Sequence, residues 1–382
     1  SHYELEFACL IPRSKSEELS TEPYVSYKGT DYKKTVRLRV PWQPIKSIKR
    51  FWHWICFVWS HSRSRKCRRI CYLLLLTIFL TSFLITCVIL PLVFKHSREY
   101  CKYVVFNPTT ATHELFDKPV KMEISYDVTK YYKPTNTYVT VNETENIKLG
   151  VWSLNPLSVK SPYLIYFHGR SGDRRSYIVD YSKLASFFHI FTFDYRGYGD
   201  STLTELNEEG LVNDSKQFVK WVISQTNVSV FIWGDTLGAS IAARTVAELH
   251  KENIFPCGLM MENSFKTMEN QLSHSWLIAK ITSYLPWYKT TIIDPLEEND
   301  LSFNISKYIS EIDSPINFWE WNSDTARGKD NNFNLINQES QTFVAVYYYS
   351  KRDGVLSSRG EDFIRSFIGI GTDYCKTRKV KH

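Results

Sequence analysis

Residues 70–94 carry no charged side chain, and this apolar run constrains the chain more than any other feature. A helix of that length reaches roughly 37 Å, which is enough to cross a hydrocarbon core of about 30 Å with some tilt. A buried core helix and the apolar part of a signal peptide are the alternatives. The run is too long and lies too far from the N-terminus for a signal peptide. We therefore expect one transmembrane helix that anchors the chain in a bilayer.

The charges around this run predict its orientation. Residues 1–95 hold 16 Lys and Arg against 6 Asp and Glu, a net charge of +10, and the remaining 31 and 34 give a net charge of −3. Basic residues are enriched on the cytosolic side of membrane helices. Residues 1–69 are therefore expected to form a cytosolic basic arm and residues 95–382 to lie across the membrane. The nearly neutral remainder argues against a nucleic-acid-binding protein.

Residues beyond the apolar run indicate the compartment. Acceptor motifs for N-glycosylation occur at Asn142, Asn213, Asn227 and Asn304. They favour a single-pass membrane protein whose C-terminal domain lies in the lumen of the endoplasmic reticulum or on an extracellular face. The cysteines on this side are Cys101, Cys257 and Cys375, so at most one disulfide forms there. Neither a metal nor a cofactor is expected, because His and Cys do not cluster at ligand spacing.

Short apolar segments alternate with amphipathic ones through residues 138–375, the expected globular domain. The expected strands are 138–141, 149–154, 163–168, 190–194, 229–233, 258–261, 315–321 and 343–349. This alternation predicts a mostly parallel sheet covered on both faces, with the first strands as antiparallel additions at one edge. Residues 266–312 are too long and aromatic for a simple loop, so we expect a helical cap there. Residues 95–137 are expected to connect the membrane helix to the domain.

Four motifs lie where expected strands end. Residues 166–169 (YFHG) lead into a loop rich in Gly and Arg, and residues 193–201 (FDYRGYGDS) follow the next strand. Residues 234–238 (GDTLG) lie between a strand and a helical segment, which is the layout of a nucleophile elbow, G-x-S-x-G. Residues 261–265 (MENSF) end the strand after that.

In their order and glycines, these motifs resemble the α/β-hydrolase superfamily. More narrowly, they resemble the membrane-anchored lysophosphatidylserine and monoacylglycerol lipases of the endoplasmic reticulum. The resemblance covers roughly residues 70–370 and includes the single N-terminal span. It implies an α/β-hydrolase fold with helices on both faces of the sheet and a helical cap. It also implies a membrane lipid or lysolipid ligand, while the sequence identifies no protein partner.

The resemblance assigns roles to individual residues. The backbone N–H groups of Gly169 and Leu237 correspond to the oxyanion hole, which binds the charge that develops on the substrate oxygen. Gly234 and Gly238 correspond to the elbow glycines. Asp324 falls at the position of the acidic triad residue.

Other residues of these motifs have structural roles in the family. Asp194 and Arg196 are expected to form a buried ion pair that shapes the sheet edge. His168 is expected to shape its loop rather than to transfer protons.

Two departures from the family pattern concern the catalytic residues. Thr236 stands where the serine nucleophile belongs. The loop that should hold the triad histidine instead contains Lys351, Arg352 and Asp353. The last histidine before the terminal His382 is His274. Asp235 replaces a residue that is usually histidine in the family, and we expect it to point away from Thr236.

These departures bear directly on function. An alcohol attacks an ester only when a base takes its proton, and known threonine nucleophiles use their own α-amine, which the internal Thr236 lacks. The favoured hypothesis is a lipase-like protein that has lost most or all serine-hydrolase activity and retains a lipid-binding cleft. The alternative is an active lysophospholipase or monoacylglycerol lipase that uses Thr236 and a base from elsewhere. A structural membrane protein without a ligand explains the aromatic cap least well.

Overall fold

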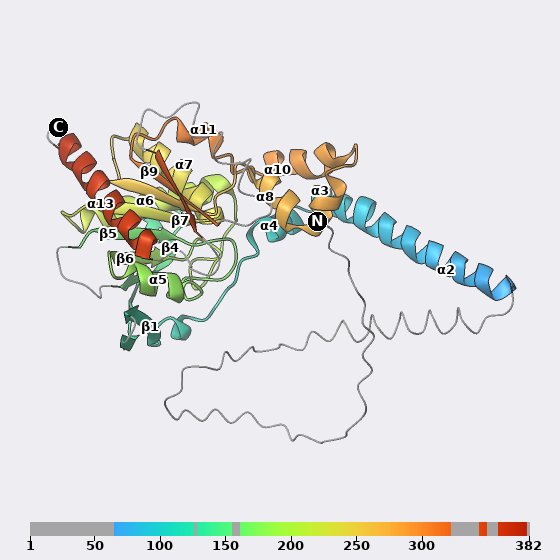
Figure 1. The fold of residues 1–382 in the computed structure, drawn as a ribbon, viewed down its shortest axis with the longest axis horizontal. Helices are drawn as coiled ribbons and strands as arrows, with labels where there is room; N and C mark the ends of the chain where they lie inside the picture. Colours follow the sequence, from blue (N-terminus) through green and yellow to red (C-terminus); the bar gives the residue numbers. More distant parts are fainter. Residues whose placement is uncertain (1–64, 126–127, 155–160, 322–343, 350–357, 380–382) are drawn as a thin grey trace, which may run out of the picture. The chain divides into compact units, whose positions relative to one another are not determined.

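The computed structural model describes residues 65–125, 128–154, 161–321, 344–349 and 358–379 (Figure 1). Contacts divide the chain after Leu73, and every described strand lies in the second part, residues 74–382. Helix α2, Arg65–Leu84, continues through the π-helical segment η1, Ile85–Ile89, into α3, Leu90–His96. The stretch Arg69–His96 is long and apolar enough to cross a membrane, and its side chains are exposed along most of its length.

Helix α4, Arg98–Phe106, follows after a single residue. Ser97 caps α4, because its Oγ accepts a hydrogen bond of 3.2 Å from the backbone N–H of Tyr100. Asn107 ends α4 in the left-handed conformation, with φ at 43°. Beyond it lie η2 (His113–Leu115) and a hairpin of β1 (Val120–Ser125) and β2 (Val128–Tyr132). The expected connector thus contains regular structure that the sequence pattern does not predict.

Eight strands form one sheet in the order β10-β9-β8-β7-β5-β6-β4-β3. They are β3 Thr135–Asn142, β4 Ile147–Leu154, β5 Tyr163–Phe167, β6 His189–Phe193, β7 Val230–Asp235, β8 Gly258–Glu262, β9 Ile316–Trp321 and β10 Val344–Tyr349. The pairs β3–β4 and β4–β6 are antiparallel and the others are parallel. This confirms the expected sheet. The loops after β5, β6, β7 and β8 meet at its carboxyl edge.

Helices cover both faces of the sheet. Alternate residues of each strand point to opposite sides, so both faces present apolar side chains to the helices. In β5, Ile165 and Phe167 belong to one buried cluster, while Leu164 and Tyr166 belong to the other. The first cluster includes side chains of α6 (Glu208–Ser224) and α7 (Leu237–Lys251), and the second includes side chains of α5 (Ile178–Leu184) and α13 (Ser358–Lys379).

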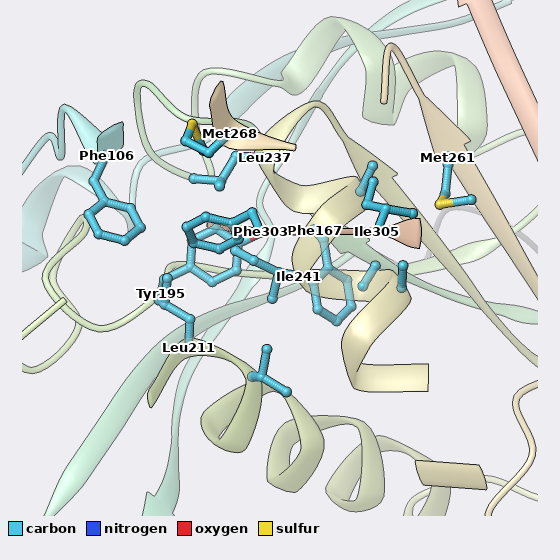
Figure 2. Close-up of a cluster of buried hydrophobic side chains, with 14 of the residues drawn as sticks. Phe106, Phe167, Tyr195, Leu211, Leu237, Ile241, Met261, Met268, Phe303 and Ile305 are labelled. Atoms are coloured by element: carbon cyan, nitrogen blue, oxygen red, sulfur yellow. The ribbon is translucent and has the colours of Figure 1, made fainter. Parts of the chain in front are cut away.

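Residues 266–312, here called the cap segment, form short helices. They are α8 (Met268–Ser275), α9 (Leu277–Thr282), η3 (Lys289–Ile293), α10 (Asp294–Glu298) and α11 (Ser306–Ile309). Met268, Phe303 and Ile305 of this segment join Phe167 and Leu237 in the first cluster (Figure 2). The cap segment is therefore part of the folded core.

A disulfide joins Cys257 to Cys375, with the two Cα atoms 5.3 Å apart. It ties α13 to the residue that precedes β8. Cys101 is a buried free thiol, and desolvation raises its pKa to about 12. The bond is consistent with the limit of one disulfide among the three cysteines on this side.

Candidate functional site

The turn between β7 and α7 has the geometry of a nucleophile elbow. The strand ends at Asp235 and the helix begins at Leu237, so Thr236 alone makes the turn. Its backbone has φ at 49° and ψ at −105°. A β-branched side chain is strongly disfavoured at positive φ. The elbow therefore keeps its strained backbone although threonine replaces serine.

Two glycines allow this turn to form. A Cβ on Gly234 would lie 2.5 Å from the Cα of Ala239, and a Cβ on Gly238 would lie 2.1 Å from the carbonyl oxygen of Phe167. Both neighbours are backbone atoms, which cannot rotate away. The backbone N–H of Thr236 also donates a hydrogen bond of 2.9 Å to the carbonyl oxygen of Glu262. Close packing of α7 on β5 and β8 thus fixes the position of Thr236.

The side chains around Thr236 meet above Gly169, at the end of β5. A Cβ on Gly169 would lie 2.7 Å from both Thr236 Oγ1 and Asp235 Oδ2, and 2.8 Å from Tyr177 Oη. The Thr236 hydroxyl and the Asp235 carboxyl group therefore both face Gly169. The expectation that Asp235 points away from Thr236 was therefore wrong. The tight turn directs both side chains into the same space.

Tyr177 occupies part of the expected oxyanion hole, and nothing in the sequence motifs pointed to it. The N–H of Gly169 donates a hydrogen bond of 3.1 Å to the Tyr177 hydroxyl, which in turn donates one of 3.1 Å to the carbonyl oxygen of Ser171. Leu237 supplies the first N–H of α7, which has no partner within the helix. Of the two N–H groups that the resemblance assigns to the oxyanion hole, that of Gly169 thus already has a hydrogen-bond partner.

Carboxyl groups make the surroundings of Thr236 acidic. Desolvation raises the pKa of Asp235 well above its ordinary value, and the charges of Glu262 and Asp180 raise it further. A protonated Asp235 cannot accept the proton of Thr236. An ionised Asp235 could accept it, but it would also repel the negative charge that develops on an ester oxygen during attack.

The imidazole groups of His168 and His250 have partners other than Thr236. His168 is buried, its Nδ1 lies 2.8 Å from the carbonyl oxygen of Gly169, and desolvation lowers its pKa to about 4. His250 lies at the far end of α7, where its Nε2 is 3.0 Å from Ser314 Oγ. No described hydrogen bond of a histidine involves Thr236.

Strand order and elbow geometry together decide the fold. The chain has an α/β-hydrolase fold. No protein-family model matches it. Over 173 residues it is 30% identical to the lysophosphatidylserine lipase ABHD12 of Rattus norvegicus, covering 44% of this chain and 42% of that protein. It is 28% identical over 197 residues to the Danio rerio lipase of that name, covering 45% of this chain and 50% of that protein. Protein ABHD12B of Homo sapiens is 25% identical over 223 residues, covering 53% and 60%.

The chain thus spans about half the length of the curated relatives it matches. Among solved structures it is similar to an esterase of Pyrococcus furiosus, with a TM-score of 0.48 and 15% identity over 66% of this chain and 98% of that one. A monoglyceride lipase variant of Saccharomyces cerevisiae gives a TM-score of 0.45 and 14% identity over 67% and 99%.

One expected ion pair of the hydrolase fold has different partners. The Asp194 carboxylate accepts hydrogen bonds from the guanidinium and the backbone N–H of Arg174, not from Arg196. Arg196 instead makes two bonds of 2.6 Å to Asp214 in α6. The expected pair was therefore wrong. Asp194 and Arg196 are thus each paired with a residue from another part of the fold and not with each other. Both buried charges have a partner in this way.

Some residues with expected roles lie outside the described residues; they are Asp324, Lys351, Arg352, Asp353 and His382. Of the glycosylation acceptors, Asn213 and Asn227 are exposed, while Asn142 and Asn304 are half-buried. In the part of the chain that the structure describes, no group of His, Cys, Asp and Glu has a geometry that could hold a metal ion.

Proposed function

We propose that this chain is a membrane-anchored, lipase-like protein that binds a lysophospholipid or monoacylglycerol and has lost most or all serine-hydrolase activity. One observation carries the proposal: the residue at the elbow is Thr236, its hydroxyl lies beside Gly169 together with the Asp235 carboxyl group, and no described hydrogen bond of a histidine involves it. The relatives named as lysophosphatidylserine lipases support the lipid class of the ligand.

The Thr236 hydroxyl would need a base to activate it. In a serine hydrolase, an imidazole takes the proton from the nucleophile and later gives it to the leaving group. A carboxyl group next to the alcohol cannot do both steps well, because its negative charge opposes the oxyanion. Loss of triad members leaves roughly 10³–10⁴ of rate enhancement over water, from the oxyanion hole and binding. At this elbow even the remaining rate enhancement is reduced, since the Gly169 N–H already donates a hydrogen bond to Tyr177.

A second candidate function rests on the same carboxyl group. An Asp235 with a raised pKa is a stronger base than an ordinary carboxylate, and its carboxyl group lies beside Gly169 together with the Thr236 hydroxyl. The chain would then be an active lysophospholipase or monoacylglycerol lipase that uses Thr236 as nucleophile and Asp235 as base. This candidate requires the rate to fall when either residue is replaced.

The proposed location is the endoplasmic reticulum membrane, with the folded domain in the lumen. The disulfide Cys257–Cys375 lies beyond the apolar helix, and structural disulfides persist in oxidising compartments. Asn213 and Asn227 are exposed, as glycosylation requires. Treatment with endoglycosidase H should reduce the mass of the expressed chain, and Asn213→Gln with Asn227→Gln should reduce that change. An unglycosylated chain with a reduced disulfide would contradict this location.

An activity-based fluorophosphonate probe separates the two candidate functions. The wild-type chain in nanodiscs should not be labelled, and lysophosphatidylserine or monoacylglycerol should raise its melting temperature, because a ligand that binds only the folded state stabilises it. Labelling that disappears in both Thr236→Ala and Asp235→Asn would support the active lipase instead. Without labelling and without lipid-dependent stabilisation, neither candidate would hold.

A further inference from the structure

Part of the cap segment presents apolar side chains to its surroundings. Leu277 and Ile281 lie one turn apart on α9 and are 68% and 41% exposed, and Tyr284 in the following turn is 87% exposed. Ala279 and Thr282, on the other face of α9, are buried. These three exposed residues are here called the cap patch. A row of exposed apolar side chains on a folded element marks a contact surface.

The cap segment is attached to the end of the apolar helix. The indole N–H of Trp287 donates a hydrogen bond of 2.8 Å to the carbonyl oxygen of Cys87 in η1. The rings of Phe94 in α3 and Trp276, just before α9, lie 5.3 Å apart. Both α9 and η3 also contact α3 (Figure 1, cap segment in orange). The cap patch therefore lies close to where this helix ends.

The length of the helix sets the depth of this contact. Cys87 lies 18 residues beyond Arg69, the last basic residue before the apolar run. That distance is roughly 27 Å along a helix. With Arg69 at the near boundary of a hydrocarbon core about 30 Å thick, the Cys87 carbonyl lies near the far boundary. Trp287 is then at the depth where tryptophan side chains accumulate in membrane proteins.

The charges around the cap patch fit a lipid surface. Lys95, Lys280 and Lys289 are exposed, and residues 274–293 contain no Asp or Glu. An apolar row with lysines beside it is typical of segments that lie in the headgroup region, where the lysines meet lipid phosphates. A second copy of the chain fits less well, because two such surfaces would bring lysines against lysines.

We propose that the cap patch lies in the headgroup region of the same bilayer that the apolar helix spans, so that the cap segment contacts the membrane surface directly. The proposal rests on the membrane anchoring proposed above. It adds that a second, separate element of the folded domain touches lipid. A lipid ligand could then reach the cap segment without crossing water.

The test uses the full chain in nanodiscs of phosphatidylcholine and phosphatidylserine. A fluorescent noncanonical amino acid replaces one residue at a time, and lipids with a doxyl group near the headgroup quench it when it is close. The probe positions are Tyr284 in the cap patch, Leu76 in the apolar helix and Val179 on α5. Val179 is the matched control, because it is 66% exposed and apolar but lies outside the cap segment.

Quenching at positions 284 and 76 that is at least twofold stronger than at position 179 is the expected result. Quenching at position 76 but not at 284 would overturn this inference and leave the anchoring intact. Absence of quenching at position 76 would show that the anchoring itself is wrong. A dimer that is seen by mass photometry and lost in Tyr284→Ser would also overturn the inference, since the patch would then bind a second copy.

Discussion

The Cα of Gly238 lies so close to the carbonyl oxygen of Phe167 that a Cβ would be 2.1 Å from it. Gly238→Ala should therefore destabilise the chain by about 3 kcal/mol or more, because the overlap is with backbone and only movement of α7 relieves it. Gly369, in α13, is the matched control: a Cβ there meets nothing within 4 Å. Gly369→Ala should stabilise the chain by about 0.5–1 kcal/mol. Thermal unfolding measures both, and equal effects would contradict the elbow packing.

Strain at Thr236 gives a second prediction. Thr236→Ser keeps the hydroxyl and removes the branch that is disfavoured at a φ of 49°. We expect this change to stabilise the chain by about 0.5–1 kcal/mol. The same substitution at Thr245, which is buried within α7, should destabilise it by about 1 kcal/mol through loss of a buried methyl group. Melting temperatures that fall in both variants would indicate an unstrained turn.

The disulfide gives a third prediction. Cys257 and Cys375 are 118 residues apart in sequence, so their bond closes a long loop in the unfolded chain. The double variant Cys257→Ser/Cys375→Ser should lose about 4 kcal/mol of stability. A reducing agent should lower the melting temperature of the wild-type chain and leave that of the double variant unchanged. A reductant effect of the same size in both would place the sensitive cysteines elsewhere.

His250 gives a pH prediction. Its Nδ1 accepts a hydrogen bond of 3.1 Å from the N–H of Asp313, so the folded state holds the neutral imidazole. Desolvation lowers its pKa from 6.5 to about 4. Between about pH 6.5 and pH 4, His250 is therefore protonated in the unfolded chain but neutral in the folded chain. The contribution of His250 to the free energy of unfolding is fully present above pH 6.5. Each pH unit of acidification within this window removes about 1.4 kcal/mol of it.

The test compares the wild-type chain with His250→Asn by thermal unfolding from pH 4 to pH 8. The difference between the two should change only below about pH 6.5, with the wild-type chain losing more stability. Parallel profiles over the whole range would mean that His250 accepts a proton in the folded state.

Local sequence signals were sufficient for the sheet and the elbow. The strands were predicted because continuous apolar segments alternate with amphipathic ones, and the elbow because two glycines flank Thr236 at fixed spacing between strand and helix. Both features depend on near neighbours in the chain. The hairpin of β1 and β2 was missed, because its strands carry charged residues and resemble a polar connector.

Features that depend on distant residues could not be predicted in this way. The pairing of Asp194 with Arg174, and the approach of Tyr177 to Gly169, follow from how two loops meet at the carboxyl edge of the sheet. The orientation of Asp235 follows from the exact backbone angles of the turn, which residue types alone do not determine. These long-range contacts decide the chemistry around Thr236.

Release of fatty acid from lysophosphatidylserine and monoacylglycerol by the purified chain tests the central claim most directly. The wild-type chain should release none above the rate of Thr236→Ala, and Thr236→Ser should not restore release, since no described hydrogen bond of a histidine reaches the elbow hydroxyl. Turnover by the wild-type chain that is lost in Thr236→Ala, or recovered release in Thr236→Ser alone, would contradict the account.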